Sequence, residues 1–124
     1  MQLVADAANA MLDALLDDFD SGGYILFHTS GDAEVANCPL NADAFAGAAA
    51  GSAAMSTGSA VTDTTTTAGV VAHAHLVTVG ATIETQLTCG IGSGEIQFSS
   101  LTYGTNETLT VSSLVVSMTT AALT

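Results

Sequence analysis

The last third of the chain alternates between apolar and polar residues, and this pattern limits the folds open to the sequence. Residues 95–101 alternate with period two, residues 102–108 contain turn formers, and residues 109–118 are rich in β-branched side chains. Period-two alternation places successive side chains on opposite faces of a strand. The segment is therefore predicted to form two strands and a connection, on which the rest of the chain can pack.

An amphipathic helix is predicted at the N-terminus, over about residues 3–19. Asp6, Asn9, Asp13 and Asp17 occupy one side of it. The apolar side follows the three- and four-residue spacing of a helix, so we expect it to face the core. The residues expected to pack there are Met11, Leu12, Leu15, Leu16 and Phe19.

Further short segments have the composition of strands separated by turns. Strands are predicted at residues 24–29, 52–57, 69–79 and 83–89, a turn at 30–32, and a Thr-rich loop or exposed edge strand at 62–67. Short strands with turns every 8–12 residues are typical of sandwiches and barrels. We therefore predict one mainly β domain over residues 1–124. It would be an antiparallel β-sandwich of jelly-roll type, with strands from about residue 24 to 118 and the helix packed against them.

The apolar residues of the chain are mostly small. They make up 48% of the sequence, but aromatic residues are only 5% and there is no Trp. Small side chains bury little apolar area each, so the core has a small margin over chain entropy. We expect self-association or docking on a larger body to supply part of the stability.

The charge is entirely of one sign. The 124 residues include 12 Asp and Glu and no Lys or Arg, which gives a net charge of −12. Without basic side chains the chain is a poor partner for nucleic acid and for anionic membranes, so neither is expected to bind. A basic docking surface or bound cations would offset the repulsion between the acids. Alternatively, the acidic surface only keeps the domain soluble.

The two cysteines and the N-terminus indicate where the chain is made. Cys38 and Cys89 have no metal-binding spacing; a disulfide between them is possible, but two buried free thiols are preferred. The first residues lack the positive and apolar regions of a signal peptide, and no membrane span follows. The protein is therefore expected to be made in a cytoplasm.

Three histidines are candidate metal ligands. His73 and His75 lie on one face of a predicted strand, about 6–7 Å apart along it. With His28 on another strand, they could converge on zinc. The sequence alone favours the alternative, in which the three histidines fill half-exposed positions or a contact in a symmetric oligomer.

A second candidate cation site lies after the predicted helix. Asp18 and Asp20, followed by Gly22, match the opening of a calcium-binding loop, but Thr29 stands where the bidentate Glu is required. A loose cation site built from Asp17, Asp18 and Asp20 is left as a weak candidate. These acids lie near the negative end of the helix dipole, where a cation would be favourable.

The motifs of common enzyme classes are absent from the sequence. There is no Gly-x-Ser-x-Gly, no phosphate-binding loop with its Lys, and no Arg for an oxyanion or phosphate. Ser and Thr are abundant, but they are weak nucleophiles without a positioned base. The chain is predicted not to be an enzyme and to use no cofactor.

Five segments of the sequence, in their order along the chain, form a recognisable pattern: residues 7–17, 22–27, 41–47, 94–98 and 108–116. This order of segments resembles that of a group of small β-rich proteins encoded among the head and tail genes of tailed phages. Pro39 lies before the third segment rather than within it, and His73 and His75 replace basic and aromatic residues expected in the middle strand. The departures concern the exposed surface more than the fold.

The resemblance implies a structural protein of a phage virion. The expected role is a capsid cement or decoration protein, made in the host cytoplasm, that binds the major capsid protein on the outer capsid surface, as a homotrimer. Alternatives are a tail, collar or fibre-base component and, from another class, a carbohydrate-binding or adhesion β-sandwich. A sugar platform needs exposed aromatics, for which Tyr24 and Tyr103 are the candidates.

Overall fold

The computed structural model describes residues 3–19, 22–42, 44–55, 61–80, 83–111 and 113–118. Within these ranges the protein is mainly β, with a helix at its N-terminus, as predicted. The elements are α1 (Ala5–Asp17), β1 (Tyr24–His28), β2 (Glu34–Pro39), β3 (Ser52–Ala54), β4 (Val61–Asp63), β5 (Gly69–Val70), β6 (His73–Val77), β7 (Ile83–Gly90), β8 (Ile96–Gln97), β9 (Thr102–Tyr103), β10 (Leu109–Val111) and β11 (Val115–Ser117).

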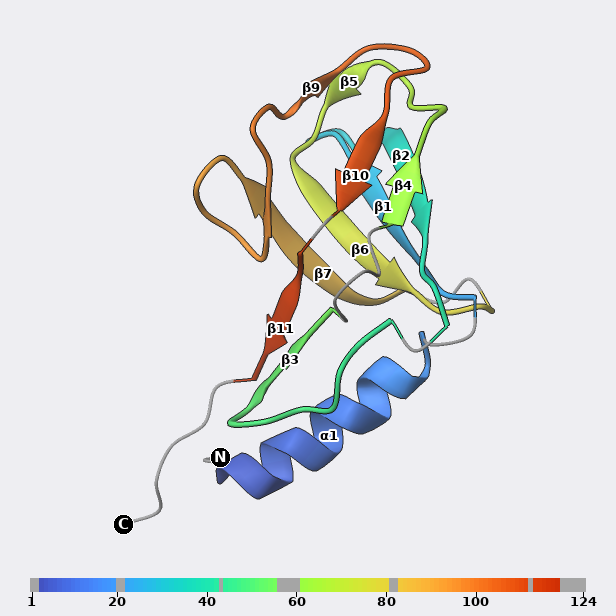
Figure 1. Ribbon diagram of the computed structural model, residues 1–124. Helices are drawn as coiled ribbons and strands as arrows, with labels where there is room; N and C mark the ends of the chain where they lie inside the picture. The colour runs from blue at the N-terminus through green and yellow to red at the C-terminus, as the bar shows by residue number, and fades with distance from the viewer. Residues whose placement is uncertain are drawn as a thin grey trace.

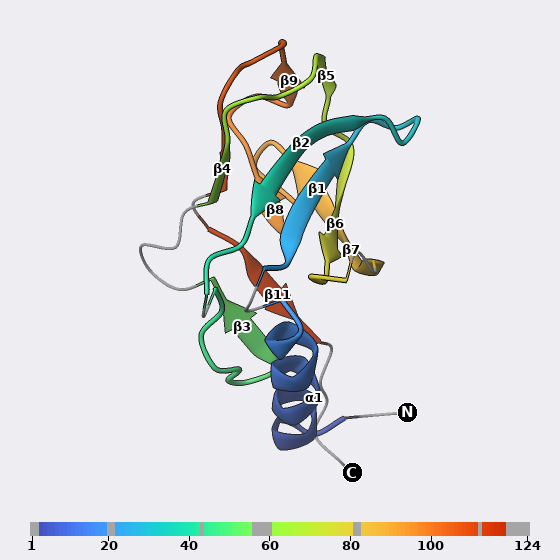
Figure 2. The ribbon, with the colours of Figure 1, turned by 90° about the vertical axis from the view of Figure 1, so that its right-hand side faces the viewer.

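The largest sheet in the described part of the chain has the strand order β2-β1-β6-β7-β8 and is curled (Figure 1). Its first four strands pair antiparallel, but β8 runs parallel to β7. The prediction of a wholly antiparallel arrangement was therefore wrong at this edge. Smaller ladders pair β4 with β10, β3 with β11 and β5 with β9. Figure 2 places β5 and β9 at one end of the molecule and α1, with β3 and β11, at the other.

The parallel pairing of β7 and β8 depends on a short glycine-rich loop. Parallel neighbours usually need a crossover of a dozen or more residues, yet here residues 91–95 make the return. Gly92 and Gly94 adopt positive φ of 71° and 90°, and a Cβ at Gly94 would lie 2.9 Å from the carbonyl oxygen of Thr88. The Glu95 carboxylate then accepts hydrogen bonds from the backbone N–H and the hydroxyl of Thr88. These features turn the chain back beside the strand it has just left.

The helix is shorter than predicted at both ends, and one of its expected core residues is exposed. Ala8, Leu12 and Leu16 form the buried stripe, and Leu15 is half-buried against the core. Met11 is 52% exposed, so its predicted packing was wrong. At 3.6 residues per turn it lies roughly a quarter turn from the centre of the stripe. No helix in the described ranges is long and apolar enough to cross a membrane.

Two polar residues of the helix hold the segment that precedes β3. The Asp13 carboxylate accepts a hydrogen bond from the backbone N–H of Ala48 (2.7 Å), and the side-chain oxygen of Asn9 accepts one from Gly51 (2.8 Å). The segment before β3, which contains Ala48 and Gly51, is low in sequence complexity and has few large side chains. Its backbone is therefore fixed to the helix by polar contacts as well as by burial of the anchor Phe45.

Two predicted strands are each divided in the structure because the chain changes partners. Residues 69–79 form β5, paired with β9, and β6, paired with β1; between them the N–H of Val71 donates to Leu101 and that of Ala72 to His28. Residues 109–118 likewise form β10 and β11, which pair with β4 and β3. The strands predicted at 24–29, 52–57 and 83–89 correspond to β1, β3 and β7, although residues 56–57 lie outside the described ranges. Of the strand predicted at 95–101, only β8 is formed.

The region predicted as a Thr-rich loop or edge strand begins with β4 and continues as a loop anchored by Thr66. This residue is 1% exposed, the one buried polar side chain among the described residues. Its hydroxyl donates to the carbonyl of Gly104 (2.8 Å) and accepts from the N–H of Glu107 (2.9 Å). The buried hydroxyl is thus satisfied, and it joins two loops distant in sequence.

Both cysteines are free thiols, as the sequence analysis preferred. Cys38 is buried on β2, and Cys89 is half-buried on β7. Burial raises the pKa of each thiol to about 12, and nearby Asp63 and Glu95 add to the respective shifts. Both side chains are therefore neutral thiols at physiological pH and poor nucleophiles.

Candidate metal centre

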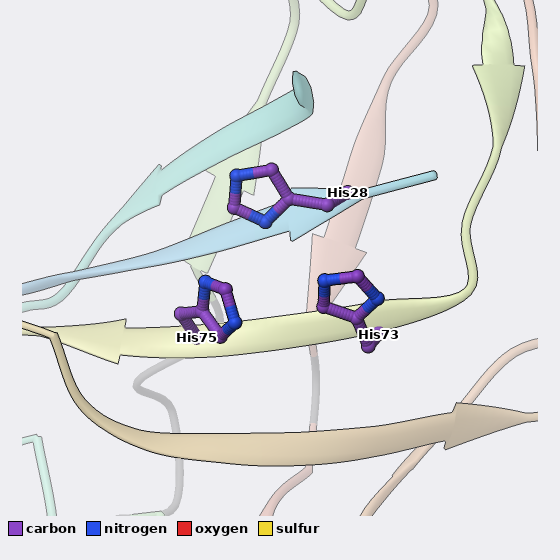
Figure 3. A group of neighbouring side chains, drawn as sticks. All are labelled: His28, His73 and His75. Carbon is purple, nitrogen blue, oxygen red and sulfur yellow. The ribbon is translucent and has the colours of Figure 1, made fainter. Parts of the chain in front are cut away.

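The three histidines of the chain meet on one face of the large sheet (Figure 3). His28 ends β1, while His73 and His75 lie on the neighbouring strand β6. His28 is directly opposite His73 in the antiparallel register, and His75 is opposite Leu26. Because β1 and β6 alternate, the intervening Phe27 and Ala74 are buried on the other face. The core thus fixes which way all three imidazoles point.

The imidazoles are close enough to act together. The ring centroids are 5.5 Å apart for His28 and His73, 4.9 Å for His28 and His75, and 5.1 Å for His73 and His75. One ring nitrogen from each residue lies within 4.8 Å of the other two. All three residues are half-buried. We call this group the histidine cluster.

Two nitrogens of the histidine cluster are buried and have no hydrogen-bond partner among the described residues, namely Nδ1 of His28 and Nδ1 of His75. Buried polar atoms in folded proteins are nearly always satisfied, so each exception calls for a physical reason. An imidazole nitrogen can be satisfied by a donor, by a water molecule or by a metal ion. The two atoms are therefore candidate ligand positions.

Burial and nearby charge favour the neutral form of the His28 ring. Burial lowers the pKa of His28 below its usual value, and the positive charge of protonated His75 and His73 lowers it further. Asp32 and Glu34 act in the opposite direction but do not restore the pKa. A neutral imidazole has a lone pair free to bind a metal.

An acidic residue that the sequence analysis missed lies beside the cluster. Oδ1 of Asp32 is 3.0 Å from Nε2 of His73, and its side chain is 78% exposed. Asp32 stands in the turn between β1 and β2 with a φ of 63°, and its backbone N–H donates to Thr29. Residues 30–32 were predicted as a turn, but their sequence gives no sign that the turn folds back over β6.

The second predicted cation site is only partly described. Asp17 and Asp18 are exposed at the C-terminal end of α1, and Asp20 lies outside the described residues. Asp17 borders a hollow between the helix and the segment around Phe45, next to Asp13. Asp13 already accepts a hydrogen bond from Ala48. Among the described residues, Asp17 and Asp18 belong to no group of three possible metal ligands, and the loose site stays a prediction.

Comparison of the chain with protein families, curated proteins and solved structures finds no match. Function must therefore be argued from the fold, the charge and the histidine cluster themselves.

Proposed function

We propose that the protein is a structural component of a phage virion, a cement or decoration protein that binds the outer surface of the capsid. The resemblance of its segment order to small virion proteins supports this role. The mainly β fold with an N-terminal helix agrees with that resemblance at the level of fold class. Binding would be passive and repeated over many copies on a lattice.

The observation that carries the proposal is the single sign of the charge. Twelve acids and no Lys or Arg leave the domain with a net charge of −12. Exposed acids occur in the helix at Asp6 and Asp17, in the β1–β2 turn at Asp32, and on β2 at Glu34. A surface of this kind is complementary to a basic partner, and electrostatic complementarity favours both encounter and register. The major capsid protein is the partner that we propose.

We also propose that the described strands belong to a sandwich of jelly-roll type. The β4–β10 pair supports this, because it packs beside β2 and its Val61, Leu109 and Val111 are buried in the same core as β1 and β6. A second layer of strands facing a sheet is the basis of a sandwich. The assembled form that we propose is a homotrimer, made in the host cytoplasm and added to the virion.

Two measurements on the purified chain and on particles test this proposal. Native mass spectrometry gives the oligomeric state, and sedimentation with capsids assembled from the major capsid protein of the same genome gives the number of bound copies. A trimer that binds in hundreds of copies, more weakly as NaCl is raised, is the expected result. A few copies per virion would indicate a tail, collar or fibre-base component instead. A chain that ignores capsids at low salt would overturn the proposal.

A further inference from the structure

We propose that His28, His73 and His75 bind one divalent transition-metal ion, with Zn²⁺ as the best fit, and that Asp32 assists as a charged neighbour. This inference concerns the chain itself and does not depend on a virion role. It rests on the geometry of the histidine cluster, on its unpartnered nitrogens and on the charge around it.

The geometry needs only small side-chain movements to close around an ion. Zn–N bonds of about 2.0–2.1 Å in a tetrahedral site place ligand nitrogens about 3.3 Å apart. One ring nitrogen from each histidine already lies within 4.8 Å of one from each of the other two. Rotation about χ1 and χ2 can supply the difference, while the β1–β6 ladder holds the backbones in place. The cluster is thus a nearly formed site on two rigid strands.

The unpartnered nitrogens give the site a reason to take an ion. Nδ1 of His28 and Nδ1 of His75 are buried and unsatisfied by any described residue. A metal ion that accepts both lone pairs would satisfy the two atoms at once. Without an ion, the close approach of three imidazoles offers no compensating hydrogen bond between them. The arrangement is better explained as a ligand set than as packing.

The surrounding charge favours a cation, and the ligand type selects which one. Asp32 and Glu34 are near enough to act electrostatically on His28, and the chain has no Lys or Arg to compete for them. Imidazole nitrogen suits zinc, copper and nickel, whereas magnesium and calcium prefer oxygen ligands. Three histidines also leave a fourth coordination position free, and Asp32 adds negative charge beside His73.

Asp32 is proposed as a positioning residue. Its carboxylate lies 3.0 Å from Nε2 of His73 and so restrains that ring. Carboxylates that contact metal-binding histidines typically contribute about 10- to 100-fold to metal affinity. Removing the charge at Asp32 should therefore weaken binding without changing the number of ions bound per chain.

The experiment uses the metal-free full-length chain and titrates it with Zn²⁺ by calorimetry, with native mass spectrometry to count ions. We expect one ion per chain, an increase of Tm with Zn²⁺ concentration, and no competition from millimolar Ca²⁺. Replacing His28→Gln or His75→Gln should abolish this binding. Asp32→Asn should weaken it about 10- to 100-fold, with recovery in Asp32→Glu.

Asp6→Asn is the matched control for Asp32→Asn, because it also removes one negative charge, but from α1. Figure 2 shows α1 near the start of β1, at the opposite end of that strand from its last residue, His28. Zinc affinity should be unchanged in this variant. If a histidine variant fails to fold, imidazole NMR signals of the unmodified chain give an independent readout, since Zn²⁺ should perturb all three residues together.

Three outcomes would overturn the proposal. The first is no Zn²⁺ binding by the unmodified chain. The second is equal affinity in folded histidine variants. The third is binding of several ions per chain that Ca²⁺ displaces, which would indicate carboxylates scattered over the acidic surface.

Discussion

Asp63, the last residue of β4, holds three hydrogen-bond donors with one carboxylate. It accepts from the backbone N–H of Asn37 (2.8 Å) and from the N–H (2.7 Å) and hydroxyl (2.9 Å) of Thr65. Burial of the Asp63 carboxyl tends to raise its pKa, but the three hydrogen bonds outweigh this and the pKa is lowered. The side chain thus ties the β4–β10 pair to the edge strand β2.

Replacing Asp63→Ala should lower the free energy of unfolding by about 1 kcal/mol at neutral pH. The three donors lose their carboxylate acceptor and must form hydrogen bonds with water instead. Asp63→Asn should cost less, since the amide oxygen can still accept. Denaturant unfolding monitored by circular dichroism measures both. Asp17→Asn, which removes an exposed acid at the negative end of the helix dipole, is the charge-matched control and should be neutral or slightly stabilising.

The contribution of Asp63 should also depend on pH in a defined direction. Its pKa is lower in the folded chain than in the unfolded one, so its stabilisation is complete above the unfolded pKa, near 4. It is lost as the pH falls through the folded pKa. The stability difference between the unmodified chain and Asp63→Asn should therefore shrink from about pH 6 to about pH 3. A difference that stays constant over this range would contradict the assignment.

At the histidine cluster, the sequence predicts part of the arrangement. Period-two geometry places His73 and His75 on one face, and the strand ending at His28 was recognisable from its apolar run. Which strands become neighbours, and in what register, depends on long-range pairing that local pattern does not encode. The contact between Asp32 and His73 is of the same kind, because it depends on the direction in which a turn folds.

At the scale of elements, the sequence predicts what each segment is more reliably than where it ends. The helix and most strand positions follow from periodicity, which is a local property. The divisions between β5 and β6 and between β10 and β11 occur where the chain exchanges one partner for another. A continuous β-branched run looks the same whether it pairs with one strand or two, so these breaks were missed.

The loop between β7 and β8 provides a test at this scale. Gly94→Ala places a side chain at a φ of 90° and 2.9 Å from the backbone of Thr88. It should destabilise the protein by about 2–3 kcal/mol, since both strain and a backbone clash are involved. Thermal and denaturant unfolding measure the loss.

Gly47→Ala is the matched control for this loop. Gly47 is exposed, and an added Cβ would meet no atom within 4 Å. Its effect should stay within about 0.5 kcal/mol, or be slightly stabilising through the unfolded chain. Equal unfolding midpoints for the two alanine variants would show that the parallel return of β8 does not need glycine at position 94.

At the scale of the whole molecule, the dominant property is a charge of −12 with no Lys or Arg to oppose it. Folding brings the acids closer together than they are in the unfolded chain, so repulsion lowers the stability of the compact state. The small side chains of the core bury little apolar area, so little stability is available to offset this repulsion. Salt or a bound cation is therefore expected to act on the protein as a whole.

The stability of the isolated chain should rise with ionic strength. The Debye length falls from about 30 Å at 0.01 M salt to about 3 Å at 1 M, so NaCl screens the acids from one another. We expect Tm, measured at pH 7 with EDTA present to exclude metal binding, to increase by several degrees over this range. At acidic pH, near the pKa of carboxyl groups in model peptides, the increase should be smaller. A Tm independent of NaCl at pH 7 would mean that the acids are too well solvated to repel one another. The charge would then be a feature of solubility, and the electrostatic argument for a basic partner would lose its main physical support.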